Sequence, residues 1–118
     1  MSDRVSWLLE VAVKPGQLDD FKALMAEMVE STQAEPGTLI YEWSINDDGS
    51  VIHLYERYAD SAATLTHLAA FGEKFVQRFL AAVDPTRFMV YGAPSDEVKE
   101  ELSAFGPVYM APFGGFAR

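Results

Sequence analysis

The chain has 118 residues, of which 49% are hydrophobic and 23% charged, with a formal net charge of −9 and no cysteine. This length suits a single domain, residues 1–118, and no apolar run is long enough for a membrane span. An acidic surface disfavours nucleic acid and anionic membranes as partners, because both reward basic residues. Without thiols there is no disulfide or thiolate metal site, and without a signal-peptide pattern a cytoplasmic protein is expected.

The first part of the chain predicts a strand followed by a helix. Apolar residues alternate with other residues over 4–13, which is the period of a strand, and Lys14-Pro15-Gly16 ends that strand. Residues 17–34 then carry apolar side chains at helical spacing. Glu35-Pro36-Gly37 ends the helix.

A hairpin is the clearest pattern in the sequence. Residues 38–45 and 51–58 are rich in β-branched and aromatic side chains, and Asn46-Asp47-Asp48-Gly49 between them is typical of a tight turn. The alternation places Val51, His53, Tyr55 and Arg57 on one face of the second strand and Ile52, Leu54, Glu56 and Tyr58 on the other. Both faces include apolar residues, so we expect helices to cover one and a second copy of the chain to cover the other.

The remaining elements complete a known plan. Asp60 or Ser61 caps a helix over residues 61–70, a break is expected at Phe71-Gly72, and a second helical piece follows at 73–83. A fourth strand is predicted at residues 87–92. The order β-α-β-β-α-β predicts an α+β fold of the ferredoxin-like, split βαβ type, with its core at about residues 4–92.

A C-terminal extension, residues 93–118, follows this core. Ser95 is placed to cap a short helix, and a short final strand is predicted at residues 107–112. The tail from Val108 to Phe116 is too apolar for a solvated end, so we expect it to be docked on a sheet edge.

Four segments, KPGQLDDF, EPGTLIYEW, LYERYAD and LTHL, occur in this order with suitable spacing. Together they resemble the antibiotic biosynthesis monooxygenase domain family, including its quinol monooxygenases, over about residues 4–92. The resemblance implies a homodimer in which two sheets form a dimeric α+β barrel. It also implies a cofactor-independent monooxygenase or quinol oxidase that uses dioxygen and a small aromatic phenol, quinol or polyketide-like substrate. The alternatives are a non-catalytic dimeric domain that binds a small molecule and a structural dimer without a ligand.

One branch of this family degrades haem, with an Asn on the first strand and a Trp/His pair near the second helix. Here the first strand offers Ser6 and Trp7, His67 stands at the Trp position, and no His follows at residues 71–74. Haem degradation is therefore not expected.

Two residues are the candidate catalytic groups. His67 is a titratable group near neutral pH, and the resemblance places a recurrent histidine there; the alternative is a histidine buried for packing. Arg57 has the charge to stabilise an enolate or phenolate, or it pairs with Glu10 or Glu42 across the sheet. His53, on the same strand face as Arg57, is read as an interface residue.

The predicted cavity lies between the sheet and the helices, with His67 at its edge. The candidate substrate-binding residues are Met25, Trp43, Tyr55, Phe71 and Phe75. Each aromatic residue has core packing as its alternative role. Glu42 and Glu56 are interpreted as structural. Two histidines without ligand spacing and no phosphate-binding loop predict no metal, flavin or haem.

Overall fold

The computed structural model describes residues 3–118. Its elements in chain order are β1 (Val5–Val13), α1 (Leu18–Gln33), β2 (Thr38–Ile45), β3 (Val51–Tyr58), α2 (Ser61–Lys74), α3 (Val76–Ala82), β4 (Val83–Gly92), α4 (Asp96–Leu102), the 3-10 helix η1 (Ser103–Phe105) and β5 (Val108–Met110). The hairpin strands have the predicted bounds, and β1 and α1 agree with the prediction to within one residue at each end.

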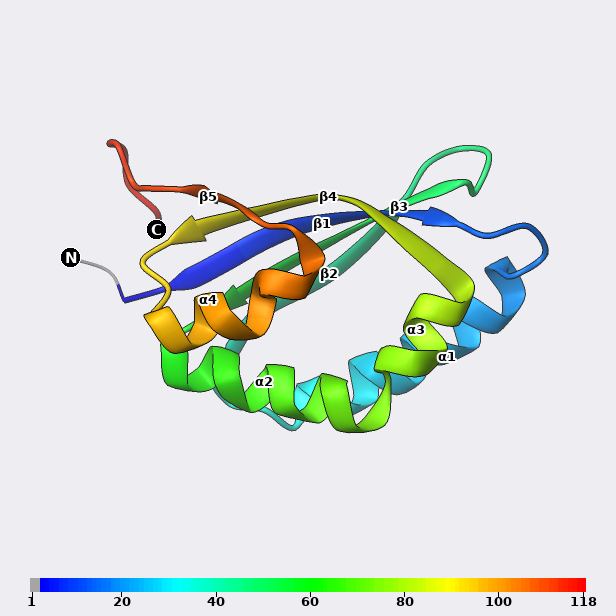
Figure 1. Ribbon diagram of the computed structural model, residues 1–118, viewed down its shortest axis with the longest axis horizontal. Helices are drawn as coiled ribbons and strands as arrows, with labels where there is room; N and C mark the ends of the chain where they lie inside the picture. Colours follow the sequence, from blue (N-terminus) through cyan, green and yellow to red (C-terminus); the bar gives the residue numbers. More distant parts are fainter. Residues whose placement is uncertain (1–2) are drawn as a thin grey trace.

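The strands form one mixed sheet in the order β2-β3-β1-β4-β5. β1 pairs antiparallel with β3 and β4, β2 pairs antiparallel with β3, and β5 runs parallel to β4 at the edge. All the helices lie on one side of this sheet (Figure 1). The predicted ferredoxin-like α+β fold is confirmed, and β5 extends this chain's own sheet.

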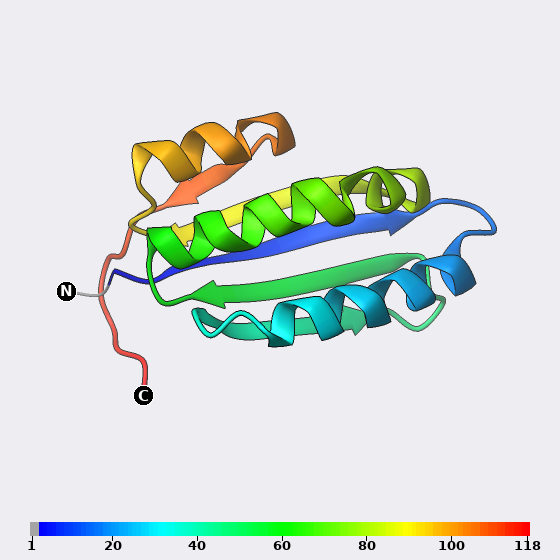
Figure 2. The same ribbon diagram turned by 90° about the horizontal axis from the view of Figure 1, so that it is seen from below.

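Burial alternates along the strands and gives the sheet two distinct faces. On the helix face, β1 contributes Val5, Trp7, Leu9 and Val11, and β3 contributes Ile52, Leu54, Glu56 and Tyr58; all eight are buried. The opposite face, here called the open face, carries the intervening side chains, which are only half-buried on β1 and β3. In the view from the helical side, α1 lies toward the β2 edge and α2 toward β4, with α4 beyond α2 (Figure 2).

The second helix and fourth strand differ from their predicted bounds. α2 continues through Gly72, and a side chain at that position would meet only open space. The break between α2 and α3 falls instead at Phe75, where φ is −128°. β4 begins at Val83 rather than at residue 87. Pro85 fits within this strand because the register with β1 shifts there, between Glu10 and Val11.

The C-terminal extension packs beside the core. Ser95 caps α4 as predicted, because its hydroxyl accepts a hydrogen bond from the Val98 backbone N–H at 3.2 Å. β5 docks on β4, but Phe113 and Phe116 beyond it are exposed, so the predicted docking holds only for part of the tail in the single chain. Within residues 3–118, none of the helices combines the length and apolarity needed to cross a membrane.

Candidate active site

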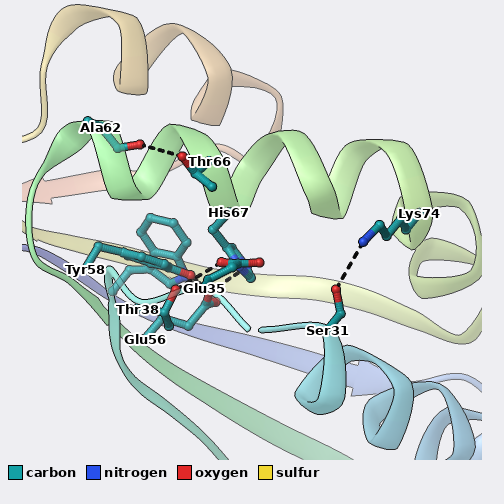
Figure 3. Close-up of polar contacts among 10 residues, drawn as sticks. Ser31, Glu35, Thr38, Glu56, Tyr58, Ala62, Thr66, His67 and Lys74 are labelled. Carbon is teal, nitrogen blue, oxygen red and sulfur yellow. Dashed lines mark hydrogen bonds and ion pairs between the residues drawn. The ribbon is translucent and has the colours of Figure 1, made fainter. Parts of the chain in front are cut away.

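His67 lies on the inward side of α2 and is only 5% exposed. Asp60 is the N-cap residue of α2, and its carboxylate accepts a hydrogen bond from the Ala63 backbone N–H at 2.8 Å. Thr64, one turn later, donates its hydroxyl hydrogen to the Asp60 carbonyl at 2.8 Å. These contacts fix the start of α2, and two turns into the helix His67 points toward the sheet (Figure 3).

The imidazole of His67 lies between two carboxylates. Its Nδ1 is 2.9 Å from Oε1 of Glu35, and its Nε2 is 3.2 Å from Oε1 of Glu56. A neutral imidazole carries only one N–H, so both contacts are hydrogen bonds only when the ring is protonated. Burial by itself lowers the pKa of His67, but the hydrogen bonds and charges of Glu56 and Glu35 outweigh it and raise that pKa. The geometry therefore favours an imidazolium.

Glu56 is a charged residue on the helix face of β3 and is only 3% exposed. Its Oε2 accepts the indole N–H of Trp7 at 2.5 Å, and its Oε1 accepts the hydroxyl of Tyr58. Burial, followed by the charge of Glu56, raises the pKa of Tyr58 well above its ordinary value, so the phenol keeps its proton and remains a donor. Three neighbours thus hold one carboxylate in a fixed position.

Glu35 reaches His67 from the turn after α1. Thr38 Oγ1 donates to Oε1 of Glu35 at 3.0 Å, and the turn itself packs closely on α2. A Cβ at Gly37 would lie 2.5 Å from the Cβ of Ala63, so glycine is required for this approach. The Gly37 carbonyl also accepts the Ala59 backbone N–H at 2.9 Å. The turn that ends α1 therefore positions the second carboxylate.

His67, Glu35 and Glu56 are here called the His67 cluster. A cavity of about 40 Å³ lies against it, between the sheet and the helices. Its polar side is formed by Glu56, His67 and Tyr41. Its apolar walls are Leu9, Met28, Leu54, Leu68, Phe71, Phe79, Phe88, Leu102 and Phe105, together with the indole of Trp7. This space is smaller than the roughly 150 Å³ of an apolar cavity that binds benzene, so a ring enters only if a wall moves.

Residues 5–84 match the family model described as antibiotic biosynthesis monooxygenase. The chain belongs to the antibiotic biosynthesis monooxygenase family. The matched segment contains β1, both helices α1 and α2, and all of the residues in the His67 cluster. No curated protein matches the chain.

Three solved structures illustrate the similarity of fold. MupZ from Pseudomonas fluorescens is 26% identical with a TM-score of 0.86, covering 99% of this chain and 96% of its own. SnoaB from Streptomyces nogalater, a cofactor-independent oxygenase, is 17% identical with a TM-score of 0.67, covering 80% of this chain and 96% of its own. Protein SO0527 from Shewanella oneidensis is 24% identical with a TM-score of 0.63, covering 76% of this chain and 88% of its own.

The predicted site residues of this family member divide into three groups. Phe71 lines the cavity beside His67, and Phe75 packs against the core at the junction of α2 and α3. Met25 and Trp43 line a second cavity of about 130 Å³, toward the β2 edge.

Arg57 and Tyr55, the other two predicted residues, lie on the open face. There Arg57 donates from Nη2 to the Tyr55 hydroxyl at 3.2 Å. The sheet separates both from His67, so the structure does not bring the two predicted catalytic residues together.

Sequence reasoning missed the two carboxylates that flank His67. Glu56 was interpreted as structural and Glu35 only as part of a helix end. A signal for Glu56 was available, because strand alternation places it between Leu54 and Tyr58 on an otherwise apolar face, where an isolated charge requires a partner. Across residues 3–118, no group of three or more His, Cys, Asp or Glu is arranged to hold a metal ion.

Proposed function

We propose that this protein is a cofactor-independent monooxygenase that oxidises a small phenol or quinol with dioxygen. The observation that carries the proposal is the His67–Glu35–Glu56 cluster at the polar end of an aromatic-walled cavity. The cluster can accept and return a proton, and the walls suit a flat apolar ring. Membership of the antibiotic biosynthesis monooxygenase family and the fold shared with SnoaB support the same reaction class.

Glu56 is the proposed proton acceptor. An ionised carboxylate has about four acceptor sites, and Trp7, Tyr58 and His67 occupy three of them. The fourth is available to a substrate hydroxyl in the cavity. Transfer of the hydroxyl proton to Glu56 leaves a phenolate, whose negative charge is stabilised by the imidazolium of His67 in a low-dielectric environment.

The oxidation then follows from the chemistry of the anion. The phenolate gives one electron to dioxygen, forming a phenoxyl radical and superoxide, and these combine at a ring carbon that bears hydrogen. Loss of water leaves a quinone, so one phenol and one O₂ give one quinone and one H₂O. A quinol instead gives two electrons and two protons to O₂, yielding a quinone and H₂O₂. The protein's part is to hold the ring in a dry cavity and to move the proton.

Oxygen uptake tests this proposal directly. Hydroquinone and 1-naphthol are incubated with wild type, with Glu56→Gln and with Glu42→Gln, a matched control on the open face of β2. We expect uptake above autoxidation for wild type and the control, and a fall of ~100-fold or more for Glu56→Gln. Added catalase returns half of the consumed oxygen if peroxide is the product. No enzyme-dependent uptake, or equal rates in all three proteins, would contradict the proposal.

A non-catalytic binding domain is the second candidate, because the cavity of about 40 Å³ is smaller than any aromatic substrate. In that case the His67 cluster only holds α2 on the sheet. A ligand-dependent rise in melting temperature without oxygen uptake would favour this reading over catalysis.

We also propose that two copies pair through their open faces. This face includes Leu8, Met89 and Tyr91 beside charged groups, and β5 adds exposed Val108 and Met110. A sheet face with this much exposed apolar surface needs a cover, and a second copy of the chain supplies one. The second copy would also bring its own Arg57–Tyr55 pair to the interface. Sedimentation at micromolar concentration should give twice the 13.1 kDa chain mass. A structure of the dimer should show an interface that buries more than roughly 1,000 Å². A stable monomer would contradict it.

A further inference from the structure

The C-terminal extension supplies one wall of the cavity. Leu102 at the end of α4 and Phe105 in η1 both line it, facing the aromatic residues of α2, α3 and β4. The matched family segment ends at residue 84, so this wall lies outside the part of the chain that defines the family. In Figure 2, α4 lies alongside α2 and the chain then turns back toward β4.

Phe105 lies among the aromatic wall residues at the surface end of the cavity. Its ring centroid is 6.4 Å from that of Phe71 and 6.3 Å from that of Phe88. Phe105, Phe71 and Leu68 are only half-buried, whereas Phe79 and Phe88 are buried. The cavity therefore approaches solvent where η1 meets α2, and Phe105 stands at that point.

The backbone around Phe105 runs from a buried anchor on α4 to a glycine turn that leads into β5. Val98 and Leu102 are 0% and 2% exposed, so they hold α4 on the core. Phe105 comes three residues after this anchor and is followed by Gly106, whose φ of +62° is in the left-handed region. Around Gly106 a side chain would meet only open space. Phe105 is half-buried beside this open turn, so the outer side of its ring faces solvent.

We propose that Phe105 determines the size of the ring that the cavity admits, and so selects single-ring phenols over fused bicyclic ones. With the Phe105 ring inward the cavity holds about 40 Å³, which is too little for any ring. When the Phe105 ring turns outward, one six-membered ring fits between Phe71 and Phe88, with its hydroxyl toward Glu56. That orientation rests on the proposed function, but the size limit does not depend on turnover.

The test measures binding in the absence of oxygen, so that the size limit of the cavity is examined separately from the proposed oxidation. Phenol and 1-naphthol are titrated anaerobically into wild type, Phe105→Ala, Phe105→Leu and Phe105→Trp. Calorimetric titration gives the dissociation constants, because Trp43, which lines the second cavity, would contribute to any tryptophan fluorescence signal. Phe113→Ala is the matched control, because it makes the same change at a phenylalanine whose side chain is fully exposed. Melting curves establish that each variant is folded.

The measured quantity is the ratio of the dissociation constant for 1-naphthol to that for phenol. We expect this ratio to fall about tenfold in Phe105→Ala, to fall less in Phe105→Leu, to rise in Phe105→Trp and to stay unchanged in Phe113→Ala. If Phe105→Ala fails to fold, the opposite shifts of the Leu and Trp variants carry the result.

Three outcomes would overturn the proposal: ratios within twofold in all folded variants, an equal change in the Phe113 control, or no binding of either phenol to any protein. Size-dependent binding without any oxygen uptake would leave this inference standing and would contradict only the proposed oxidation.

Discussion

The two histidines of this protein make the same contact in two different environments. His67 and His53 each place a ring nitrogen 2.9 Å from a glutamate oxygen, Glu35 and Glu10 respectively. The His67 side chain is 7% exposed and has a second carboxylate, Glu56, on its other nitrogen. The His53 side chain is 42% exposed, on the open face. A contact distance therefore does not distinguish a structural surface pair from a candidate reaction centre; burial and the number of partners do.

The same contrast applies to the two glutamates. Glu10 accepts hydrogen bonds from His53 and from Thr86 Oγ1, at 2.7 Å, and these lower its pKa. In the single chain the side chains of His53 and Glu10 are 42% and 25% exposed, so water there can compensate for the loss of the pair. Glu56 is only 3% exposed, and three buried donors depend on it. Removing one member of a buried charged network leaves the others uncompensated.

The largest expected effect comes from Glu56→Ala. Trp7 and Tyr58 lose their acceptor and His67 loses one of its two carboxylates, so the free energy of unfolding should fall by ~3–5 kcal/mol. Urea unfolding measures the change. Glu10→Ala, the matched substitution on the open face, should have a much smaller effect. Equal losses in the two variants would mean that burial does not separate the two pairs.

A smaller effect is expected on turnover from His67→Gln. The amide keeps hydrogen-bonding capacity between Glu35 and Glu56 but carries no charge, so the phenolate loses its cation, and kcat should fall by ~100-fold. His53→Gln is the control, and its kcat should be unchanged. If His67→Gln instead lowers the melting temperature and leaves the rate per folded protein intact, His67 has a packing role only.

The pH dependence of the free energy of unfolding provides a third test, with a smaller expected effect. The pKa of His67 is raised on folding, so its stabilising contribution is fully present below the unfolded value of about 6.5 and is lost as pH rises through the folded value. The difference in unfolding free energy between wild type and His67→Gln should therefore shrink from about pH 6.5 upward. Its slope should not exceed about 1.4 kcal/mol per pH unit, the limit for one proton. A difference that is constant over this range, or one that grows, would contradict the protonated cluster.

The sequence predicted the fold better than it predicted the cluster, for a physical reason. The hairpin strands follow from local alternation and turn residues, and their predicted bounds are those of the structure. His67 was singled out because it is one of only two histidines. Its partner Glu35 lies 32 residues away, on a turn that reaches α2 only because Gly37 permits close approach to Ala63. Such contacts are set by tertiary packing, so the sequence pattern contains no direct signal for them.

The predicted helix break at Phe71-Gly72 is wrong. A glycine inside a helix costs only about 1 kcal/mol, and the surrounding packing of α2 outweighs this cost. Arg57 and His67 are both predicted catalytic residues, but the structure places them on opposite sides of the sheet. Strand alternation already placed Arg57 beside His53 and Tyr55, on the face that α2 does not cover.

The smallest expected effect is that of His53→Ala on the melting temperature. Its dependence on salt compares the His53–Glu10 pair with the buried His67 cluster. His53→Ala should lower the melting temperature of the single chain only slightly, because the His53–Glu10 pair is partly exposed to water there. Raising the ionic strength from about 0.1 M to about 1 M shortens the Debye length from about 10 Å to about 3 Å. The difference between wild type and His53→Ala should therefore shrink at high salt, measured by thermal melting. The difference between wild type and His67→Gln should persist, because the buried carboxylates are little screened. If salt removes both differences equally, then the His67 cluster is accessible to solvent and cannot provide the dry site that the proposed oxidation requires.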